Sequence, residues 1–299
     1  MNVFIAKLLM FLLKIFAYLP LPVAHFFGAI LGLINFICNR KSRKHARLNL
    51  SQSALIAPKN VNKILLKNAM ENGKGVLETL SLWFKSLTTV ISYVKTVHGW
   101  NAVELALKQG NGVIFLTPHL GCFEITSLYY GADFPMTVLY RQPKKTWLQP
   151  LILQGRERGN IKLAPANMQG VRDLLGALKR GEAVGILPDQ TPAMGEGEWA
   201  NLFDKPAYTM TLASKLALKT GAVVFMAYGE RLTWGRGYAI HITQLQSGVV
   251  NTVQGLNHAI ETQIAQNPVQ YLWAYPRYKI RQFNRDKLTE FLIKKSTKK

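Results

Sequence analysis

Short apolar runs that alternate with longer helical patterns constrain the fold of this chain most strongly. The run at residues 112–117 (Gly-Val-Ile-Phe-Leu-Thr) is bounded by turn residues and is typical of a buried strand. Strand-like runs follow at residues 136–140, 183–187, 222–228 and 238–243, and helical patterns lie at residues 61–87, 146–158, 168–180 and 210–220. Strands alternating with helices predict an α/β fold with a central mixed, largely parallel sheet flanked by helices.

The N-terminal segment is apolar enough to bear on where the protein resides. Residues 3–19 are almost wholly apolar except for Lys7 and Lys14, and prolines separate them from a second apolar stretch at residues 21–38. As a helix, that stretch is long enough to enter or cross a bilayer. A basic cluster follows this stretch at once: Arg40, Lys41, Arg43, Lys44 and Arg47. By the positive-inside bias, this cluster predicts that the rest of the chain lies on the cytoplasmic side. A cleaved signal peptide, for which no Ala-x-Ala site follows, and a buried helical hairpin are the alternatives.

Composition narrows the class of partner. The 299 residues include 37 Lys and Arg against 16 Asp and Glu, which gives a formal net charge of +21. Such an excess predicts attraction to nucleic acid, to an acidic carrier protein or to phospholipid headgroups. Only two cysteines occur, Cys38 and Cys122, with neither metal-ligand spacing nor a readable disulfide framework. We therefore expect no metal site and a reducing, cytosolic setting for the soluble part.

The most informative segment is residues 117–124 (Thr-Pro-His-Leu-Gly-Cys-Phe-Glu), in which Glu124 follows His119 by five positions. His119 comes directly after a predicted strand, and ligands bind at the carboxyl ends of strands in open α/β sheets. From a turn before the next helix, the ring can swing toward Glu124, whose carboxylate would hold the imidazole for general-base catalysis. From the spacing alone, a histidine capping the helix and a glutamate on its solvent face is the simpler interpretation.

The wider sequence resembles the late acyltransferases of lipid A biosynthesis, the lauroyl and myristoyl transferase family. The segment around His119 resembles the His-x4-Asp/Glu motif of these enzymes, and the resemblance covers most of the chain. The other matching stretches are Gln-Gly-Arg-Glu around Arg156, the strand that ends in Asp189-Gln190, the stretch from Phe203 to Ala207 (family Phe-Gly-x-Pro-Ala), and the segment from Trp273 to Lys279 (family Trp-x-x-x-Arg-Phe-Lys).

Three departures from the family pattern leave the His119 and Glu124 positions intact. Cys122 and Phe123 stand where many relatives carry Asn and Trp. Asp204 replaces the Gly of the Phe-Gly-x-Pro-Ala stretch, and Tyr275 stands where many relatives carry His. The length of the transferred acyl chain therefore stays open.

The resemblance also implies roles for residues outside the motif. Arg156 would bind phosphate or stabilise the oxyanion of a tetrahedral intermediate, and Asp189 would orient Arg156 or another supporting group. A solvated helix arginine and an ordinary turn aspartate are the alternatives. Arg141, Lys144 and Lys145 form a basic turn at a strand end. We expect this turn to contact an anionic headgroup or carrier, with a solvated run of charges as the alternative.

A cysteine nucleophile is a different mechanism that the sequence permits. Cys122 lies three positions from His119 and falls early in a predicted helix, whose dipole would lower the pKa of its thiol. The family precedent is direct transfer, and a free cysteine is most often simply buried.

Together these features predict membrane-anchor helices at residues 1–38 and an acyltransferase domain at residues 39–299. The resemblance implies that a fatty acyl chain moves from acyl carrier protein to a hydroxyl of an acylated lipid A precursor, without a cofactor, at the cytoplasmic face of the bacterial inner membrane. Membrane phospholipid is a further expected partner, and nucleic acid is not, because interleaved aromatic and basic residues are missing. The alternatives are a glycerophospholipid (lysophosphatidate) acyltransferase and a non-enzymatic peripheral membrane-binding or nucleic-acid-binding protein.

Overall fold

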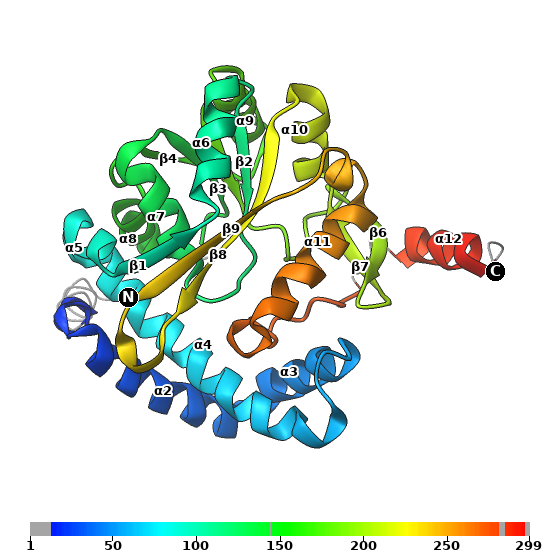
Figure 1. Ribbon diagram of the computed structural model, residues 1–299. Helices are drawn as coiled ribbons and strands as arrows, with labels where there is room; N and C mark the ends of the chain where they lie inside the picture. The colour runs from blue at the N-terminus through cyan, green and yellow to red at the C-terminus, as the bar shows by residue number, and fades with distance from the viewer. Residues whose placement is uncertain (1–12, 144, 281–284, 297–299) are drawn as a thin grey trace.

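A seven-stranded sheet forms the centre of the computed structural model, which describes residues 13–143, 145–280 and 285–296 (Figure 1). The strand order is β1-β9-β8-β2-β5-β3-β4, and only β8 and β9 pair antiparallel within it. The strands are β1 (Val94–His98), β2 (Val113–Leu116), β3 (Met136–Tyr140), β4 (Ile161–Pro165), β5 (Ala183–Ile186), β8 (Val223–Arg231) and β9 (Tyr238–Gln244). The predicted mixed, largely parallel sheet is confirmed.

Helices flank this sheet on both faces, as the alternating pattern predicted (Figure 1). The α-helices are α2 (Leu21–Cys38), α3 (Arg40–Gln52), α4 (Val61–Phe84), α5 (Leu87–Ser92), α6 (Trp100–Gln109), α7 (Phe123–Asp133), α8 (Gln149–Arg156), α9 (Met168–Lys179), α10 (Leu212–Thr220), α11 (Val253–Gln266) and α12 (Arg285–Ser296). The helical pattern at residues 61–87 thus corresponds to α4, which ends at Phe84, and the pattern at residues 146–158 yields the shorter α8.

The central strands are continuous apolar runs because both faces of the sheet are covered. In β2, Val113 and Phe115 face a core shared with α6 and α7. Ile114 and Leu116 face the opposite core, which includes side chains from α9, α10 and α11. All four residues are buried, as expected for a central strand that is covered on both faces.

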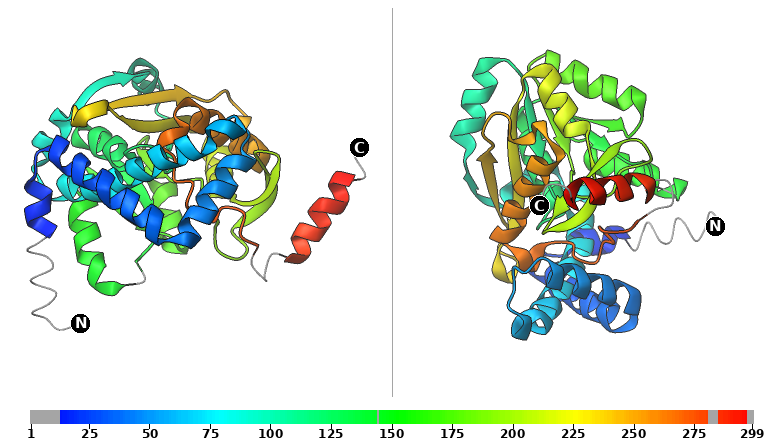
Figure 2. Two further views of the ribbon diagram at one scale, coloured as in Figure 1. Left: turned by 90° about the horizontal axis from the view of Figure 1, so that it is seen from below. Right: turned by 90° about the vertical axis from the view of Figure 1, so that its right-hand side faces the viewer.

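A layer of N-terminal helices lies along one side of this α/β body. Figures 1 and 2 agree that α2 runs beside α4, with α3 next to them. On its other side, α4 is fixed to the C-terminal segment, because the Asn68 amide donates to the carbonyls of Val269 and Tyr271, both at 2.7 Å. Within the described ranges, α2 is the one helix long and apolar enough to cross a membrane by length and composition.

A two-stranded hairpin that the apolar patterns did not predict lies apart from the main sheet. It consists of β6 (Gly197–Leu202) and β7 (Lys205–Met210). Its two-residue turn places Phe203 at φ +48° and Asp204 at φ +58°, both in the left-handed region. Such turns favour glycine, which explains why a Gly at the position of Asp204 suits the family pattern.

Candidate active site

The candidate site lies where β2 and β5 end side by side. The two strands are parallel, and Leu116 pairs with Ile186, so the residues that follow them emerge at one edge of the sheet. His119 and Asp189 each come three residues after the strand ends. As predicted, His119 lies in the turn between a strand and the next helix, α7.

Asp189 holds the His119 ring. The ring Nδ1 lies 2.8 Å from Asp189 Oδ1, and the His119 backbone N–H donates to Asp189 Oδ2 at 3.0 Å. Burial raises the pKa of the Asp189 carboxyl, but the charge and hydrogen bonds of His119 outweigh it and hold that pKa below its usual value. Because an ionised carboxylate only accepts hydrogen bonds, Nδ1 carries the proton and Nε2 is the basic nitrogen. This Nε2 lies 3.0 Å from the side-chain amide nitrogen of Gln190.

Glu124 makes a different contact from the one predicted. Its carboxylate is buried in the first turn of α7 and accepts hydrogen bonds from Arg156 on α8. The Arg156 Nε donates to Oε1 at 2.9 Å and to Oε2 at 3.0 Å, and Nη2 also donates to Oε1. Two expected pairings are therefore corrected: Asp189 rather than Glu124 orients His119, and Glu124 rather than Asp189 orients Arg156. The reason is that the register of β2 on β5 brings Asp189 to the His119 turn, which local spacing cannot show.

A small, largely apolar cavity, open to solvent, lies beside the Glu124–Arg156 pair. Its other lining residues come from the ends of β2 and β5 and from α7, β3 and β4: Thr117, Phe123, Thr126, Ser127, Met136, Val138, Ile161, Leu163, Gly185, Ile186 and Leu187. His119 is not itself a lining residue, but its ring packs on Phe123, which is one, with ring centroids 5.0 Å apart, so His119 lies next to this cavity. A charged rim above apolar walls suits a molecule with a polar reacting group and a hydrocarbon chain.

The backbone around His119 is fixed by segments far along the chain. Gly121 has φ +62°, and a Cβ there would meet the carbonyl oxygen of Gly229 at 2.1 Å, so only glycine fits. The Gly121 N–H donates to the carbonyl of Gln270 at 3.1 Å, and the Leu272 N–H donates to the carbonyl of His119 at 3.0 Å. The turn is thus held between β8 and the segment after α11, which limits the positions that His119 can take.

The predicted basic turn lies at the same edge of the sheet, directly after β3. Arg141 and Lys145 are exposed there, and neither lines the cavity. Lys144 lies outside the described residues. The structure therefore places two predicted cations beyond the cavity, and their contact with an anionic partner stays a prediction.

Cys122 is buried, which argues against its thiol as a nucleophile. Burial raises the pKa of its thiol well above the usual value, and the nearby Glu78 raises it further. Its backbone N–H donates to the carbonyl of Gly229 at 2.7 Å. Among the residues with described positions, no group of three His, Cys, Asp or Glu side chains could hold a metal ion.

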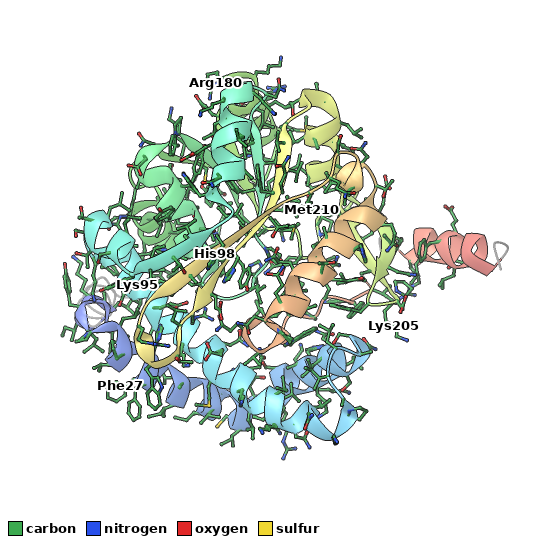
Figure 3. All side chains as sticks on the ribbon, viewed as in Figure 1. Phe27, Lys95, His98, Arg180, Lys205 and Met210 are labelled. Atoms are coloured by element: carbon green, nitrogen blue, oxygen red, sulfur yellow. The ribbon has the colours of Figure 1, made fainter. Side chains whose placement is uncertain are left out.

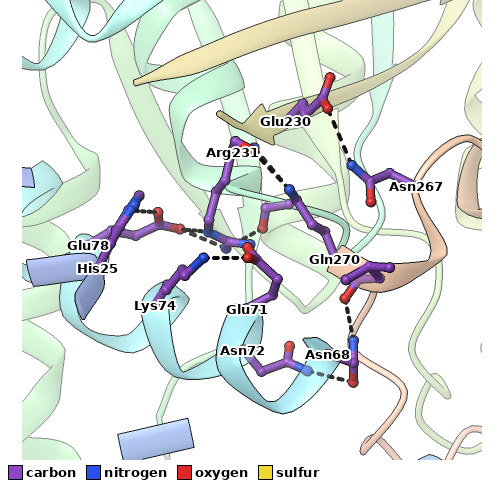
Figure 4. Close-up of polar contacts among 12 residues, drawn as sticks. His25, Asn68, Glu71, Asn72, Lys74, Glu78, Glu230, Arg231, Asn267 and Gln270 are labelled. Atoms are coloured by element: carbon purple, nitrogen blue, oxygen red, sulfur yellow. Dashed lines mark hydrogen bonds and ion pairs between the residues drawn. The ribbon is translucent and has the colours of Figure 1, made fainter. Parts of the chain in front are cut away.

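A second group of charges, which the sequence patterns did not reveal, is buried beneath the His119 turn (Figure 4). Arg231 Nη2 donates to the carbonyl of Gly121 at 2.7 Å, and Nε donates to Glu78 Oε1 at 2.7 Å. Glu78 Oε2 accepts from the Tyr238 hydroxyl at 3.0 Å and lies 3.0 Å from His25 Nε2. Burial raises the pKa of the Glu78 carboxyl, but Arg231 and His25 together lower it to about 2. The only sequence signal was a carboxylate on the apolar face of α4.

Comparison with known proteins identifies the family. The chain matches the bacterial lipid A biosynthesis acyltransferase family over residues 1–280. It is 28% identical over 278 residues to the lipid A biosynthesis palmitoleoyltransferase of Escherichia coli (strain K12), an alignment that covers 90% of this chain and 89% of the relative. It is 26% identical over 274 residues to the lipid A biosynthesis lauroyltransferase of the same organism, covering 88% and 87%. The match spans the His119 turn, Arg156 and Asp189, and the chain belongs to the bacterial lipid A biosynthesis acyltransferase family.

Proposed function

We propose that this enzyme moves a fatty acyl chain from a thioester on acyl carrier protein to a hydroxyl of an acylated lipid A precursor. Family membership supports acyl transfer in lipid A biosynthesis. The observation that carries the mechanism is the 2.8 Å contact between His119 Nδ1 and Asp189, which leaves Nε2 as a base next to an apolar cavity. This chemistry needs no cofactor beyond the acyl donor.

In the proposed reaction, the substrate hydroxyl displaces the Gln190 amide and gives its proton to His119 Nε2. The oxygen attacks the thioester carbonyl carbon, and the tetrahedral intermediate carries the negative charge on the former carbonyl oxygen. Its collapse breaks the carbon–sulfur bond and yields the new ester. The leaving thiolate takes the proton back from the imidazolium, so that the base is regenerated. Asp189 stabilises the imidazolium through the bond at Nδ1.

Arg156 supplies positive charge in this proposal, and Glu124 is the residue that positions it. Glu124 engages the Nε and Nη2 side of the guanidinium. Across the described part of the chain, no hydrogen bond involves Arg156 Nη1, which would be left for the oxyanion or for a phosphate of the acceptor. The Arg156 side chain retains 25% exposure at the cavity, whereas that of Glu124 retains 5%.

The acidic donor and the membrane location belong to the same proposal. Arg141, Lys144 and Lys145 would contact the acidic carrier protein or the phosphates of the acceptor, in keeping with the net charge of +21. The apolar α2 and the basic cluster after it favour attachment to the cytoplasmic face of the inner membrane, with phospholipid as a partner.

The test is an acyl-transfer assay with the full-length enzyme, a defined acyl carrier protein thioester and a tetraacylated lipid A precursor, read by mass spectrometry of the lipid product. We expect His119→Ala to lower turnover about 10²- to 10⁴-fold, as removal of a general base does. His258→Ala is the matched control, because His258 also lies near a carboxylate, Glu261 at 3.6 Å, but is 76% exposed on α11. Full activity in His119→Ala, or transfer to lysophosphatidate in preference to the lipid A precursor, would contradict the proposal.

A further inference from the structure

Helix α2 carries its large apolar side chains on the exposed side and its small or polar side chains on the buried side, the opposite of a surface helix in a water-soluble protein. The side that packs against the protein is small or polar: Ala24, His25, Gly28, Ala29 and Gly32, with Leu21 at its start. The opposite side is large, apolar and exposed: Val23, Phe26, Phe27, Ile30, Leu31, Ile34 and Ile37. Phe27 projects from the outer edge of the molecule (Figure 3). Because a water-soluble fold buries its large apolar side chains, this outer face needs an apolar partner.

The inner face holds α2 tightly along the length of α4. A Cβ on Gly32 would lie 2.0 Å from the carbonyl oxygen of Ala69, and a Cβ on Gly73 would lie 2.1 Å from the carbonyl oxygen of Gly28. The two backbones therefore touch. Nearer the start of α2, the His25 ring bonds Glu78 at 3.0 Å within the buried charge group. These contacts join α2 to the folded body through both close packing and a buried polar bond.

This attachment decides how α2 can meet a membrane. If α2 crossed the bilayer while packed in this way, α4 would enter the hydrocarbon beside it. Helix α4 carries the charged residues Lys63, Lys67, Glu71, Lys74 and Glu78, and its Asn68 is bonded to the C-terminal segment of the body. Charged side chains at membrane depth are costly. A position parallel to the surface lets the outer face of α2 enter lipid without drawing the length of α4 into the hydrocarbon.

The positive charges beside the outer face of α2 indicate which kind of membrane surface it contacts. Helix α3 follows α2 after a single residue, Asn39, and presents the exposed side chains of Arg40, Lys41, Lys44 and Arg47. Lys14, before α2, is exposed as well. Basic residues flanking an exposed apolar helix face match a leaflet of anionic lipids, whose headgroups attract each cation.

We propose that α2 lies in the plane of the membrane as a monotopic docking surface, with its Phe26, Phe27 and Ile30 side in the acyl region of an anionic leaflet and the cations of α3 on the headgroups. The proposal rests on the surface and packing of α2 and not on the acyl-transfer chemistry. A failed transfer assay therefore leaves it intact.

The decisive measurement is depth at three positions on one face of α2. Val23, Ile30 and Ile37 are seven residues apart, so they share that face. Each is changed singly to cysteine in the full chain carrying Cys38→Ser, which removes the exposed native thiol, while Cys122 is buried. The thiols are spin-labelled, and depth is read in phosphatidylethanolamine vesicles containing about a quarter phosphatidylglycerol.

For an in-plane helix, the three labels report the same shallow depth. For a spanning helix, the depths of the first and last labels differ by about 20 Å, because a helix rises about 1.5 Å per residue. That gradient would overturn the proposal. Three labels that remain in water on vesicles would overturn it as well, and would point to a protein partner for this face.

A binding measurement with matched variants adds a second readout. We expect Phe26→Ser/Phe27→Ser/Ile30→Ser to lower vesicle partitioning about 100-fold or more, because three large side chains leave the lipid. Leu105→Ser/Leu218→Ser is the control: both residues are about as exposed, at 61% and 60%, but lie on α6 and α10, on the side of the molecule away from α2 (Figure 1). Equal loss in the two variants would overturn the assignment of lipid contact to α2.

Discussion

The two charge groups of this protein differ in how far their side chains are exposed. The Glu124–Arg156 pair lines an open cavity, and the His119–Asp189 pair lies next to it; the side chains of His119 and Arg156 retain 15% and 25% exposure. In the Glu78–Arg231 group, which we call the lower charge group, the two side chains retain only 2% and 6% exposure. Gly121 connects the groups, because its carbonyl accepts from Arg231 and it follows His119 by two residues.

This difference in exposure suggests different roles for the two groups, one in the reaction and the other in stabilising the fold. In the lower charge group, Arg231 contacts two carboxylates, Glu78 and Glu71, and the Gly121 carbonyl. This set is closed to solvent, and the buried Glu71 Oε2, which has no hydrogen-bond partner among the described residues, lies 3.7 Å from Arg231 Nη1. The open pairs keep a basic nitrogen and part of a guanidinium for a substrate. We therefore expect substitutions in the open pairs to affect turnover and substitutions in the lower charge group to affect stability.

Apart from the loss of His119 itself, Asp189→Asn should have the largest effect, and it should act mainly on turnover. An amide can donate to Nδ1, so the proton would move to Nε2 and the base would be lost. We expect turnover to fall about 10³- to 10⁴-fold in the acyl-transfer assay, a loss of about 4 to 5 kcal/mol in transition-state stabilisation. The free energy of unfolding, measured by denaturant titration, should change by about 1 kcal/mol or less. A stability loss that accounts for the activity loss would remove the distinction between the two groups.

Arg231→Met should have the next largest effect and should act on stability. The substitution keeps the volume of the side chain roughly but leaves the buried Glu78 without its cation, which costs about 3 to 5 kcal/mol. Denaturant titration measures the loss. Arg156→Met is the matched control, and we expect a smaller loss because Arg156 is partly exposed. Equal losses would mean that exposure at the cavity does not distinguish the groups.

Lowering the pH from about 4.5 toward 2 should reduce the stability that the lower charge group contributes to the folded protein. The pKa of Glu78 is lowered to about 2 in the folded protein, against an ordinary value of 4.5. Since the folded pKa lies below the unfolded one, Glu78 contributes stability above about pH 4.5, and this contribution is lost as the pH falls toward 2. The full loss is on the order of 3 kcal/mol. The free energy of unfolding between pH 5 and pH 2.5 should therefore fall more steeply for the native chain than for Glu78→Gln.

The central part of the fold was predictable, and its edges were not, for one physical reason. Strands β2 and β5 are covered on both faces, so each of their residues is buried and the sequence reads as an apolar run. Strand β1 lies at one edge and has no buried residue, and β4 lies at the other with an exposed Lys162 and a terminal proline. Neither edge strand produces the apolar pattern that predicts a strand.

For the candidate site, the structure brings together four residues that the sequence singled out, but in pairs that differ from the predicted ones. His119 and Asp189 follow strand ends, as the sequence predicted, whereas Glu124 lies on α7 and Arg156 at the end of α8. Which carboxylate meets which cation depends on strand register and on where α8 lies, and both are set by contacts between distant segments. The role of Arg231 was not predicted, because its neighbours in the sequence form no pattern that indicates it.

Cys122→Ala should have the smallest effect. It tests whether the thiol of Cys122, which lies between the two charge groups, takes part in the reaction. Cys122 is 2% exposed, and burial together with Glu78 raises the pKa of its thiol well above the usual value. A protonated, buried thiol cannot attack a thioester, so we expect turnover to stay within about threefold of the native value. Loss of one buried sulfur should cost about 1 kcal/mol of stability. A loss of turnover of about 100-fold at unchanged stability, or an acyl group found on Cys122 by mass spectrometry of the intact enzyme, would restore the thiol mechanism. In that case the lower charge group would contribute to catalysis as well, because Arg231 and Glu78 would then determine the electrostatic environment of the nucleophile.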